Sequence, residues 1–362
     1  MRVCIVAEGC YPFVVGGVSS WIHSMIRLFP QTEFIILAIA ANRTQRGKYA
    51  YELPENVSEV YEVYLQDVDW GRKRRKRFRL NKEQYHALRS LILDQDIEWN
   101  VLFDLFQNYS VSLNDLLMGE DFLNAVTECY RIKYSQIVFS DFLWTMRSIY
   151  LPLFLTMGME IPKADLYHCV ATGYAGVLGS MAKHKYGCRL LISEHGIYTR
   201  EREEELIKAK WVTGVYKNIW IDQFRKMSRL AYQESSLVTS LFEQARQLQI
   251  ELGCPPEKTV VTPNGIRVEN LQNLAGKQPE DEEKINIGAV LRVTPIKDVK
   301  TMIQAFGFAK QREPRLKYGL WVRGTRMKHM QMNALSWHSR SVWETLNLLD
   351  ESISRIIWGA WI

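Results

Sequence analysis

Two short apolar runs on either side of an amphipathic segment constrain this chain most. Residues 3–7 (VCIVA) and 33–39 (EFIILAI) are long enough for strands, and their continuous apolar character is typical of strands buried on both faces of a parallel sheet. Between them, apolar side chains recur at helical spacing at Val18, Trp21, Ile22, Met25, Ile26 and Phe29. The order strand, helix, strand predicts a βαβ unit and therefore an α/β fold.

The alternation of strands and helices is interrupted once and then resumes. Residues of about 66 to 160 are aromatic, charged and helical in period, which predicts a helical insertion in the first domain. Further strands are predicted at 164–170, 189–192, 236–240 and 259–262, with helices at 173–184, about 202–233 and 241–252. We therefore expect a first domain over 1–275, a polar linker over 276–284, a second α/β domain that starts over 285–322, and a tail over 323–362.

Composition narrows the class of protein. The chain has 362 residues, 47% of them hydrophobic, which is enough for one large domain or two ordinary ones. Its six cysteines form no CxxC pair, so a zinc site is not expected. Scattered cysteines indicate a reducing compartment, and we expect a cytoplasmic location.

The net positive charge of +6 comes from one short run of basic residues. Residues 72–79 (RKRRKRFR) carry seven positive charges, and removing them leaves the rest of the chain at −1. A chain that is not basic elsewhere is a poor candidate for nucleic-acid binding. The run itself is either a solvated loop or a contact for an anionic membrane surface or an acidic partner.

Polar clusters follow the predicted strands, where ligands bind in open α/β sheets. The first is Gly16-Gly17, directly before the first helix. Glycines let the backbone approach a ligand closely, and a helix N-terminus supplies free N–H groups and the positive end of a dipole. This arrangement suits a phosphate or a sugar hydroxyl; a plain tight turn is the alternative.

The second cluster combines His168 and Tyr174 with the stretch SEHGIYTRER, residues 193–202. One histidine at a strand end is more often structural, but two at neighbouring strand ends, with Arg200 close by, favour a site. A neutral histidine can donate to a sugar hydroxyl and an arginine can hold a phosphate. The acids at 201–205 begin a helix, where they stabilise its dipole, so we assign them no catalytic role.

The third cluster pairs Arg292 with Lys297 across a proline turn, between a predicted strand and a predicted helix. Both side chains can point at one anion over the N-terminus of that helix. A surface turn without a ligand is the alternative.

The clusters, taken in this order, resemble the Pel exopolysaccharide glycosyltransferases of the PelF type, within retaining glycosyltransferase family 4. The resemblance covers residues 1 to about 322 and rests on GGVSSW (16–21), HCVATGYAG (168–176), SEHGIYTRER, PNGI (263–266) and RVTPIKD (292–298). It implies a GT-B architecture, with a Rossmann-like N-terminal domain that binds a saccharide acceptor. The second Rossmann-like domain would bind a nucleotide-sugar donor that is UDP-linked, with UDP-glucose expected.

The resemblance also implies roles for single residues. Arg292 and Lys297 match the pair on the donor diphosphate, Gly16-Gly17 match the loop that approaches the donor phosphates, and His195 matches a histidine close to the transferred sugar. We name His195 as the catalytic residue, and no metal ion, cofactor or side-chain nucleophile is expected. Three side chains are assigned to the acceptor or sugar side: His168, Tyr174 and Arg200.

The resemblance ends after Val322. Nothing over 323–362 matches the family's later βα units or its pair of glutamates. When the tail is translated two bases late, residues 327–334 permit DEAYANEC, which resembles the family's acidic segment. We therefore expect a shift of reading frame near codon 323, an incomplete second domain, and little or no activity.

Two functions from different classes remain open. The first is glycosyl transfer in exopolysaccharide biosynthesis, in the cytoplasm or peripherally at the inner face of the membrane with a membrane-bound synthesis complex. The second is a catalytically silent module that binds an acceptor or a partner. A hydrolase is not supported, since the sequence contains no GxSxG, HExxH or P-loop motif.

Overall fold

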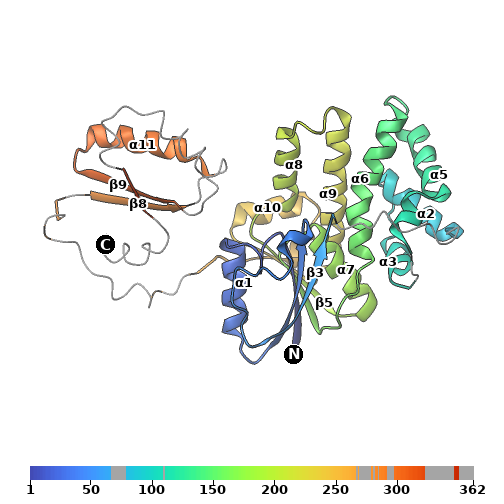
Figure 1. Ribbon diagram of the computed structural model, residues 1–362, viewed down its shortest axis with the longest axis horizontal. Helices are drawn as coiled ribbons and strands as arrows, with labels where there is room; N and C mark the ends of the chain where they lie inside the picture. The colour runs from blue at the N-terminus through green and yellow to red at the C-terminus, as the bar shows by residue number, and fades with distance from the viewer. Residues whose placement is uncertain are drawn as a thin grey trace. The chain divides into compact units, whose positions relative to one another are not determined.

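The computed structural model describes residues 1–66, 79–108, 111–265, 285–291, 297–322 and 346–349, with isolated positions at 268, 279 and 282–283. Arg292 and residues 72–78 of the basic run lie outside the described residues. The chain divides into two compact units, Met1–Asn264 and Gly265–Ile362 (Figure 1). This division lies ahead of the linker expected at 276–284, most of which is also outside the described residues.

The first unit is built on a parallel sheet of seven strands in the order β3-β2-β1-β4-β5-β6-β7. The strands are β1 (Arg2–Glu8), β2 (Glu33–Ala40), β3 (Val57–Tyr64), β4 (Leu166–Cys169), β5 (Arg189–Glu194), β6 (Leu237–Ser240) and β7 (Thr259–Val261). Sequence analysis missed only β3. This strand at the end of the sheet is half-buried and alternates apolar with charged residues (VSEVYEVY), so it lacks the continuous apolar run of a central strand.

Helices connect the strands and cover both faces of the sheet. They are α1 (Gly17–Leu28), α2 (Lys82–Leu93), α3 (Trp99–Asn108), α4 (Leu113–Leu117), α5 (Glu120–Cys129), α6 (Phe139–Met157), α7 (Tyr174–Tyr186), α8 (Tyr198–Lys208), α9 (Val215–Glu234) and α10 (Glu243–Glu251). Helices α2 to α6 lie between β3 and β4, where we expected the insertion. No helix in the described residues is long and apolar enough to cross a membrane.

The apolar run of β1 serves two cores. Val3, Ile5 and Ala7 pack with Ile22 and Ile26 of α1 on one face of the sheet. The alternate residues Cys4 and Val6 belong to a larger core on the other face. Because successive side chains of a strand point to opposite faces, a strand between two cores must be apolar at every position.

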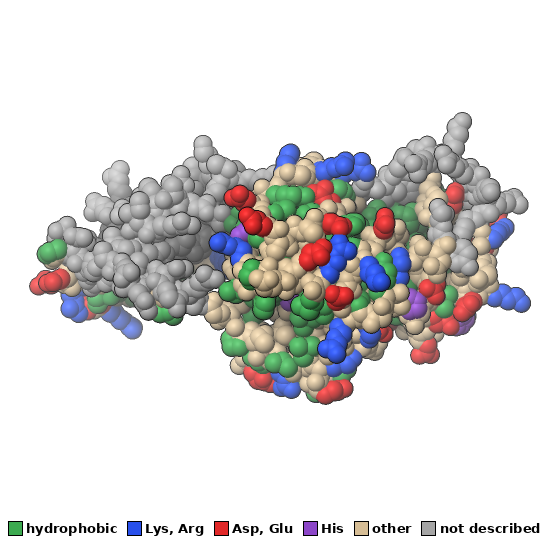
Figure 2. Space-filling view, turned by 90° about the horizontal axis from the view of Figure 1, so that it is seen from below, with side chains coloured by type: hydrophobic (Ala, Val, Ile, Leu, Met, Phe, Trp, Pro, Cys, Tyr) green, Lys and Arg blue, Asp and Glu red, His purple; other side chains and the backbone are tan. Residues whose placement is uncertain are grey.

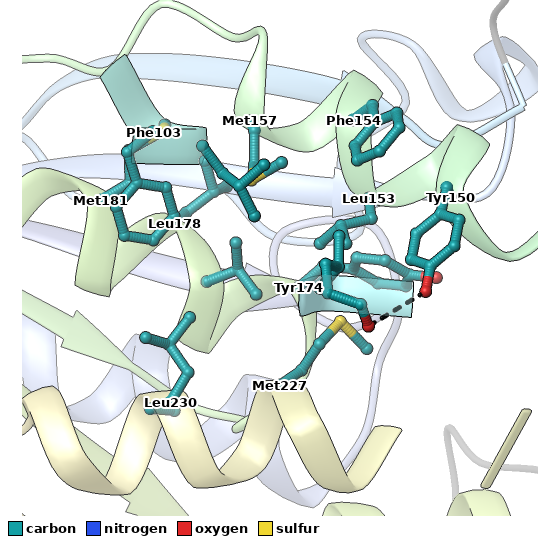
Figure 3. Packing of buried hydrophobic residues seen from close by; sticks show 14 of the residues in the cluster. Phe103, Tyr150, Leu153, Phe154, Met157, Tyr174, Leu178, Met181, Met227 and Leu230 are labelled. Carbon is teal, nitrogen blue, oxygen red and sulfur yellow. Dashed lines mark hydrogen bonds between the residues drawn. The ribbon is translucent and has the colours of Figure 1, made fainter. Parts of the chain in front are cut away.

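The larger core joins the sheet to the helical insertion. Figure 3 shows side chains of α3, α6, α7 and α9 interdigitating, among them Phe103, Leu153, Leu178 and Met227. Each fully buried side chain of this size contributes about 2–3 kcal/mol to folding. These contacts fix α7 and α9 against the sheet, and both helices contribute residues to the site described below.

The second unit contains a three-stranded parallel sheet in the order β10-β9-β8. Its elements are β8 (Ile285–Leu291), α11 (Val299–Arg312), β9 (Leu316–Val322) and β10 (Leu346–Leu349). Helix α11 begins where the Asp298 side chain accepts a hydrogen bond from the Thr301 N–H. Strand β10, in the tail that lacks the family's motifs, pairs in parallel with β9.

Candidate active site

The strand order reverses between β1 and β4, whose carboxyl ends lie side by side. From β1 the chain runs through α1 to β2 on one side, whereas from β4 it runs through α7 to β5 on the other. Helices α1 and α7 pack on opposite faces of the sheet. Such a reversal of strand order is where open α/β sheets bind ligands, and the N-termini of α1 and α7 both follow strands at this edge.

Trp21 connects the clusters that the sequence identified. Its ring lies one turn into α1, with its centroid 4.5 Å from the His195 ring and 5.7 Å from the His168 ring, both edge to face. Gly17 begins the same helix. The structure thus brings the Gly16-Gly17 turn, His168 and His195 to one place.

His195 has a free hydrogen-bonding atom. It follows β5 directly, and the ring is half-buried. Its Nε2 is shielded from solvent and has no hydrogen-bond partner within the described part of the chain. Burial lowers the pKa of His195, so the imidazole is neutral at physiological pH. A neutral ring with one uncommitted nitrogen can donate to, or accept from, a ligand hydroxyl.

His168 is held more tightly. It is 5% exposed, and its Nε2 lies 2.8 Å from the Ser193 hydroxyl, which also accepts a hydrogen bond from Thr239. Burial, with a smaller effect of nearby His195, lowers the pKa of His168 to about 4. This geometry favours support of β5 and Trp21 over the direct sugar contact that we expected.

Two carboxyl groups, buried Glu194 and half-buried Glu8, organise the surroundings of His195. Glu194 accepts hydrogen bonds from the Tyr198 N–H and from the side chains of Thr172, Tyr232 and Gln249. Glu8 accepts from the Ala175 N–H and from the Tyr198 hydroxyl. Burial raises the pKa of both carboxyls. Sequence analysis did not identify either residue as part of the site.

Glu8 makes the two helix N-termini at this edge of the sheet unequal. Its carboxylate binds an N–H in the first turn of α7 and thereby occupies the positive end of that helix. Helix α1 instead begins at Gly16-Gly17, with no side-chain cap and no acid in its first turn. Of the two helices, α1 is therefore the one whose first N–H groups remain available for an anion or a hydroxyl.

Tyr174 and Arg200 differ in their exposure. Tyr174 is 7% exposed, in the first turn of α7. Arg200 lies on the exposed face of α8, with its guanidinium 3.7 Å from Glu203. The assignment of these two side chains to the acceptor or sugar side stays a prediction.

Comparisons with known proteins place the chain in a family. Residues 1–257 match the family model described as "Domain of unknown function (DUF3492)". The chain belongs to the DUF3492 family. No protein with a curated description matches the sequence.

Solved structures share the fold of this DUF3492 chain. The crystal structure of Anabaena HepE with UDP matches with a TM-score of 0.52 at 12% identity, over 99% of this chain and 72% of that one. HepE structures with UDP-glucose, and with UDP and glucose, match over the same shares with a TM-score of 0.50 and 12% identity. The predicted fold class, α/β with GT-B architecture, is confirmed.

The third cluster belongs to the second unit of the DUF3492 chain. Lys297 is exposed and immediately precedes Asp298, the N-cap of α11. Its intended partner Arg292 lies outside the described residues. No group of three or more His, Cys, Asp or Glu side chains with the geometry of a metal site occurs in the described ranges.

A substitution at Gly173 tests how tightly the start of α7 packs against Tyr198. A Cβ at this position would lie 2.2–2.6 Å from atoms of the Tyr198 ring. We expect Gly173→Ala to displace Tyr198 from Glu8 and to lower the free energy of unfolding by about 1–3 kcal/mol. Urea unfolding followed by circular dichroism measures the change.

Gly17→Ala is the matched control for Gly173→Ala, because a Cβ at Gly17 meets nothing within 4 Å. Its unfolding free energy is expected to stay within about 0.5 kcal/mol of the parent chain. Equal effects of the two substitutions would contradict the close contact between Gly173 and Tyr198.

Proposed function

We propose that this chain is a glycosyltransferase that uses a nucleotide-sugar donor. The observation that carries the proposal is the meeting of two groups at the point where the strand order reverses. These are the N-terminus of α1, which has no side-chain cap, and the neutral, uncommitted nitrogen of His195. The likeness to HepE, whose crystal structures contain UDP and UDP-glucose, supports a UDP-sugar as the donor.

Each group has a distinct proposed role. The N–H groups at Gly16-Gly17 bind a phosphate oxygen or a sugar hydroxyl, with help from the helix dipole. His195 hydrogen-bonds the sugar to be transferred. Arg292 and Lys297 of the second unit neutralise the charge that develops on the departing diphosphate, which is electrostatic stabilisation of the transition state. His168, Glu8 and Glu194 hold His195 in place.

The finer assignment follows the sequence motifs. We propose the PelF type within retaining family 4, UDP-glucose as the donor, a growing exopolysaccharide as the acceptor, and no metal ion or cofactor. The chain would act in the cytoplasm, at the inner face of the membrane and beside a membrane-bound synthesis complex.

We also retain the proposal of a shifted reading frame near codon 323, which predicts little or no turnover by this chain. Sequencing the gene tests it. A sequence in which one added base cannot restore the frame of the acidic segment removes the proposal, whereas a single-base restoration supports it.

The second candidate is a silent acceptor- or partner-binding module. This candidate is favoured by a difference between the described parts of the two units. The first has large cores on both faces of its sheet, whereas the described part of the second has three strands and the single helix α11. Binding of UDP distinguishes the two candidates, since only the transferase requires a donor site.

Calorimetric titration with UDP and UDP-glucose tests the donor site. We expect both to bind, and we expect Gly17→Asp to weaken UDP binding about tenfold, because it places a negative charge at the N-terminus of α1. His195→Ala should weaken UDP-glucose by about tenfold and leave UDP nearly unchanged, because His195 contacts the sugar.

Ser24→Asp is the matched control for Gly17→Asp. Ser24 is exposed on the same helix but lies about two turns beyond the N-terminus. It should change the affinity for UDP less than about twofold. No measurable binding of UDP to the parent chain would exclude the transferase and leave the binding module.

A further inference from the structure

Two loops meet at one end of the first unit and form what we call the tip surface, residues 130–138 and 207–217. The first segment holds the π-helical turn Tyr130–Tyr134 and leads into α6, and the second joins α8 to α9. In Figure 1 the turn between α8 and α9 lies at the top of the first unit. The Tyr216 hydroxyl donates to the Val138 carbonyl over 3.5 Å, so the two segments are in contact.

The tip surface exposes large apolar side chains. Trp211 is 70% exposed, Val138 61%, Ile207 60% and Ile132 57%. Trp211 contacts the ring of Trp220 edge to face, with 5.8 Å between centroids, which fixes the indole on the α8–α9 turn. Single exposed apolar residues are ordinary on a protein surface, but four on two touching loops indicate an interaction site.

The charge of the tip surface is of one sign. Residues 130–138 and 207–217 contain five basic residues and no Asp or Glu: Arg131, Lys133, Lys208, Lys210 and Lys217. Lys208 forms an ion pair with Glu204, one turn earlier in α8, and Lys217 donates a hydrogen bond to the Ile207 carbonyl. Figure 2 views the first unit from below, away from the α8–α9 turn, and there basic and acidic side chains are mixed.

We propose that the tip surface binds the surface of an anionic lipid bilayer. Trp211, Ile207, Val138 and Ile132 enter the boundary between headgroups and acyl chains, where tryptophan is favoured. The five basic side chains then lie at the level of the anionic headgroups and attract them. The combination of exposed apolar residues at loop ends with basic side chains favours a bilayer, because an anionic and fluid surface complements both.

This inference does not depend on the proposed transferase function. The tip surface comprises residues other than the Gly16-Gly17 turn and His195, so vesicle binding and UDP binding can fail separately. If both hold, the first unit is anchored at the membrane through the ends of α8 and α9, and α8 begins three residues after His195.

Cosedimentation of the full chain with protein-free vesicles tests the proposal. We expect binding to vesicles of phosphatidylglycerol and phosphatidylcholine, little binding to phosphatidylcholine alone, and loss of binding in high salt. The double variant Ile207→Ser/Trp211→Ser should bind at least about tenfold more weakly. Lys208→Gln/Lys210→Gln should weaken binding to the anionic vesicles and reduce its dependence on salt.

Phe308→Ser is the matched control, since Phe308 is 69% exposed but lies on α11, outside the tip surface. It should bind vesicles as the parent chain does, and circular dichroism checks that each variant is folded. Equal binding by the parent and both double variants would overturn the proposal. So would failure of the parent chain to bind anionic vesicles, even if it bound native membranes, because a membrane protein would then be the partner.

Discussion

Replacing Glu194 with alanine is expected to lower the free energy of unfolding of the first unit by about 3–5 kcal/mol, the largest effect of any single substitution considered. The carboxylate is 3% exposed and accepts four hydrogen bonds. Its removal leaves Thr172, Tyr232 and Gln249 facing a cavity without their acceptor, and an unmade buried hydrogen bond costs more than a made one contributes. His195 follows Glu194 directly, so the same change should also loosen the site.

Urea unfolding of the parent chain and of Glu194→Ala, followed by circular dichroism, measures this effect. Glu205→Ala is the matched control, because Glu205 is exposed and pairs with Arg202 on the surface of α8. Its cost should stay below about 1 kcal/mol. Glu194→Gln should be intermediate, since an amide keeps one acceptor oxygen but turns an N–H₂ group toward donors. A loss below 1 kcal/mol in Glu194→Ala would contradict the central role of this carboxylate.

The part of the fold that the sequence predicted is the part that depends on local pattern. The apolar run 3–7 is a strand because it is covered on both faces, and its helix follows directly. Prediction from apolar runs fails for a strand that is only partly buried. Strand β3 pairs only with β2 and is half-buried, so its alternating charges resembled a loop.

The candidate site depends on strand order, which local pattern does not determine. Glu194 finds partners from residues 172 to 249, and Glu8 reaches α7 only because β4 lies beside β1. A glutamate at the end of an apolar strand was the available signal for both residues. Sequence analysis named the N-terminus that follows Gly16-Gly17 but not that of α7, and it did not show that Glu8 binds the first turn of α7.

His168 is expected to make the first unit less stable as the medium becomes acidic. Burial lowers its pKa from 6.5 to about 4, with a further contribution from His195. The unfolded chain then binds a proton between pH 6.5 and 4 that the folded chain does not bind. His168 therefore does not reduce the free energy of unfolding above pH 6.5. As the pH falls from 6.5 through 4, the unfolding free energy decreases by about 3 kcal/mol in total.

The raised pKa values of Glu8 and Glu194 act in the opposite sense, because a carboxyl whose folded pKa is raised is favoured at low pH. The stability of the parent chain alone therefore mixes these contributions. The unfolding free energy of the parent minus that of His168→Gln isolates the contribution of the histidine. This difference should be about 3 kcal/mol lower at pH 4 than at pH 7.

Ser193→Ala separates the imidazole from its hydrogen bond. This variant removes the hydroxyl 2.8 Å from His168 Nε2 but leaves the ring buried beside Trp21. Since burial is the larger cause of the low pKa, Ser193→Ala should lose a constant amount of stability and keep the dependence on pH. If the pH dependence disappears with Ser193, the hydrogen bond rather than burial keeps His168 neutral, and the rigid support that we assign to this residue beneath His195 would depend on that single contact.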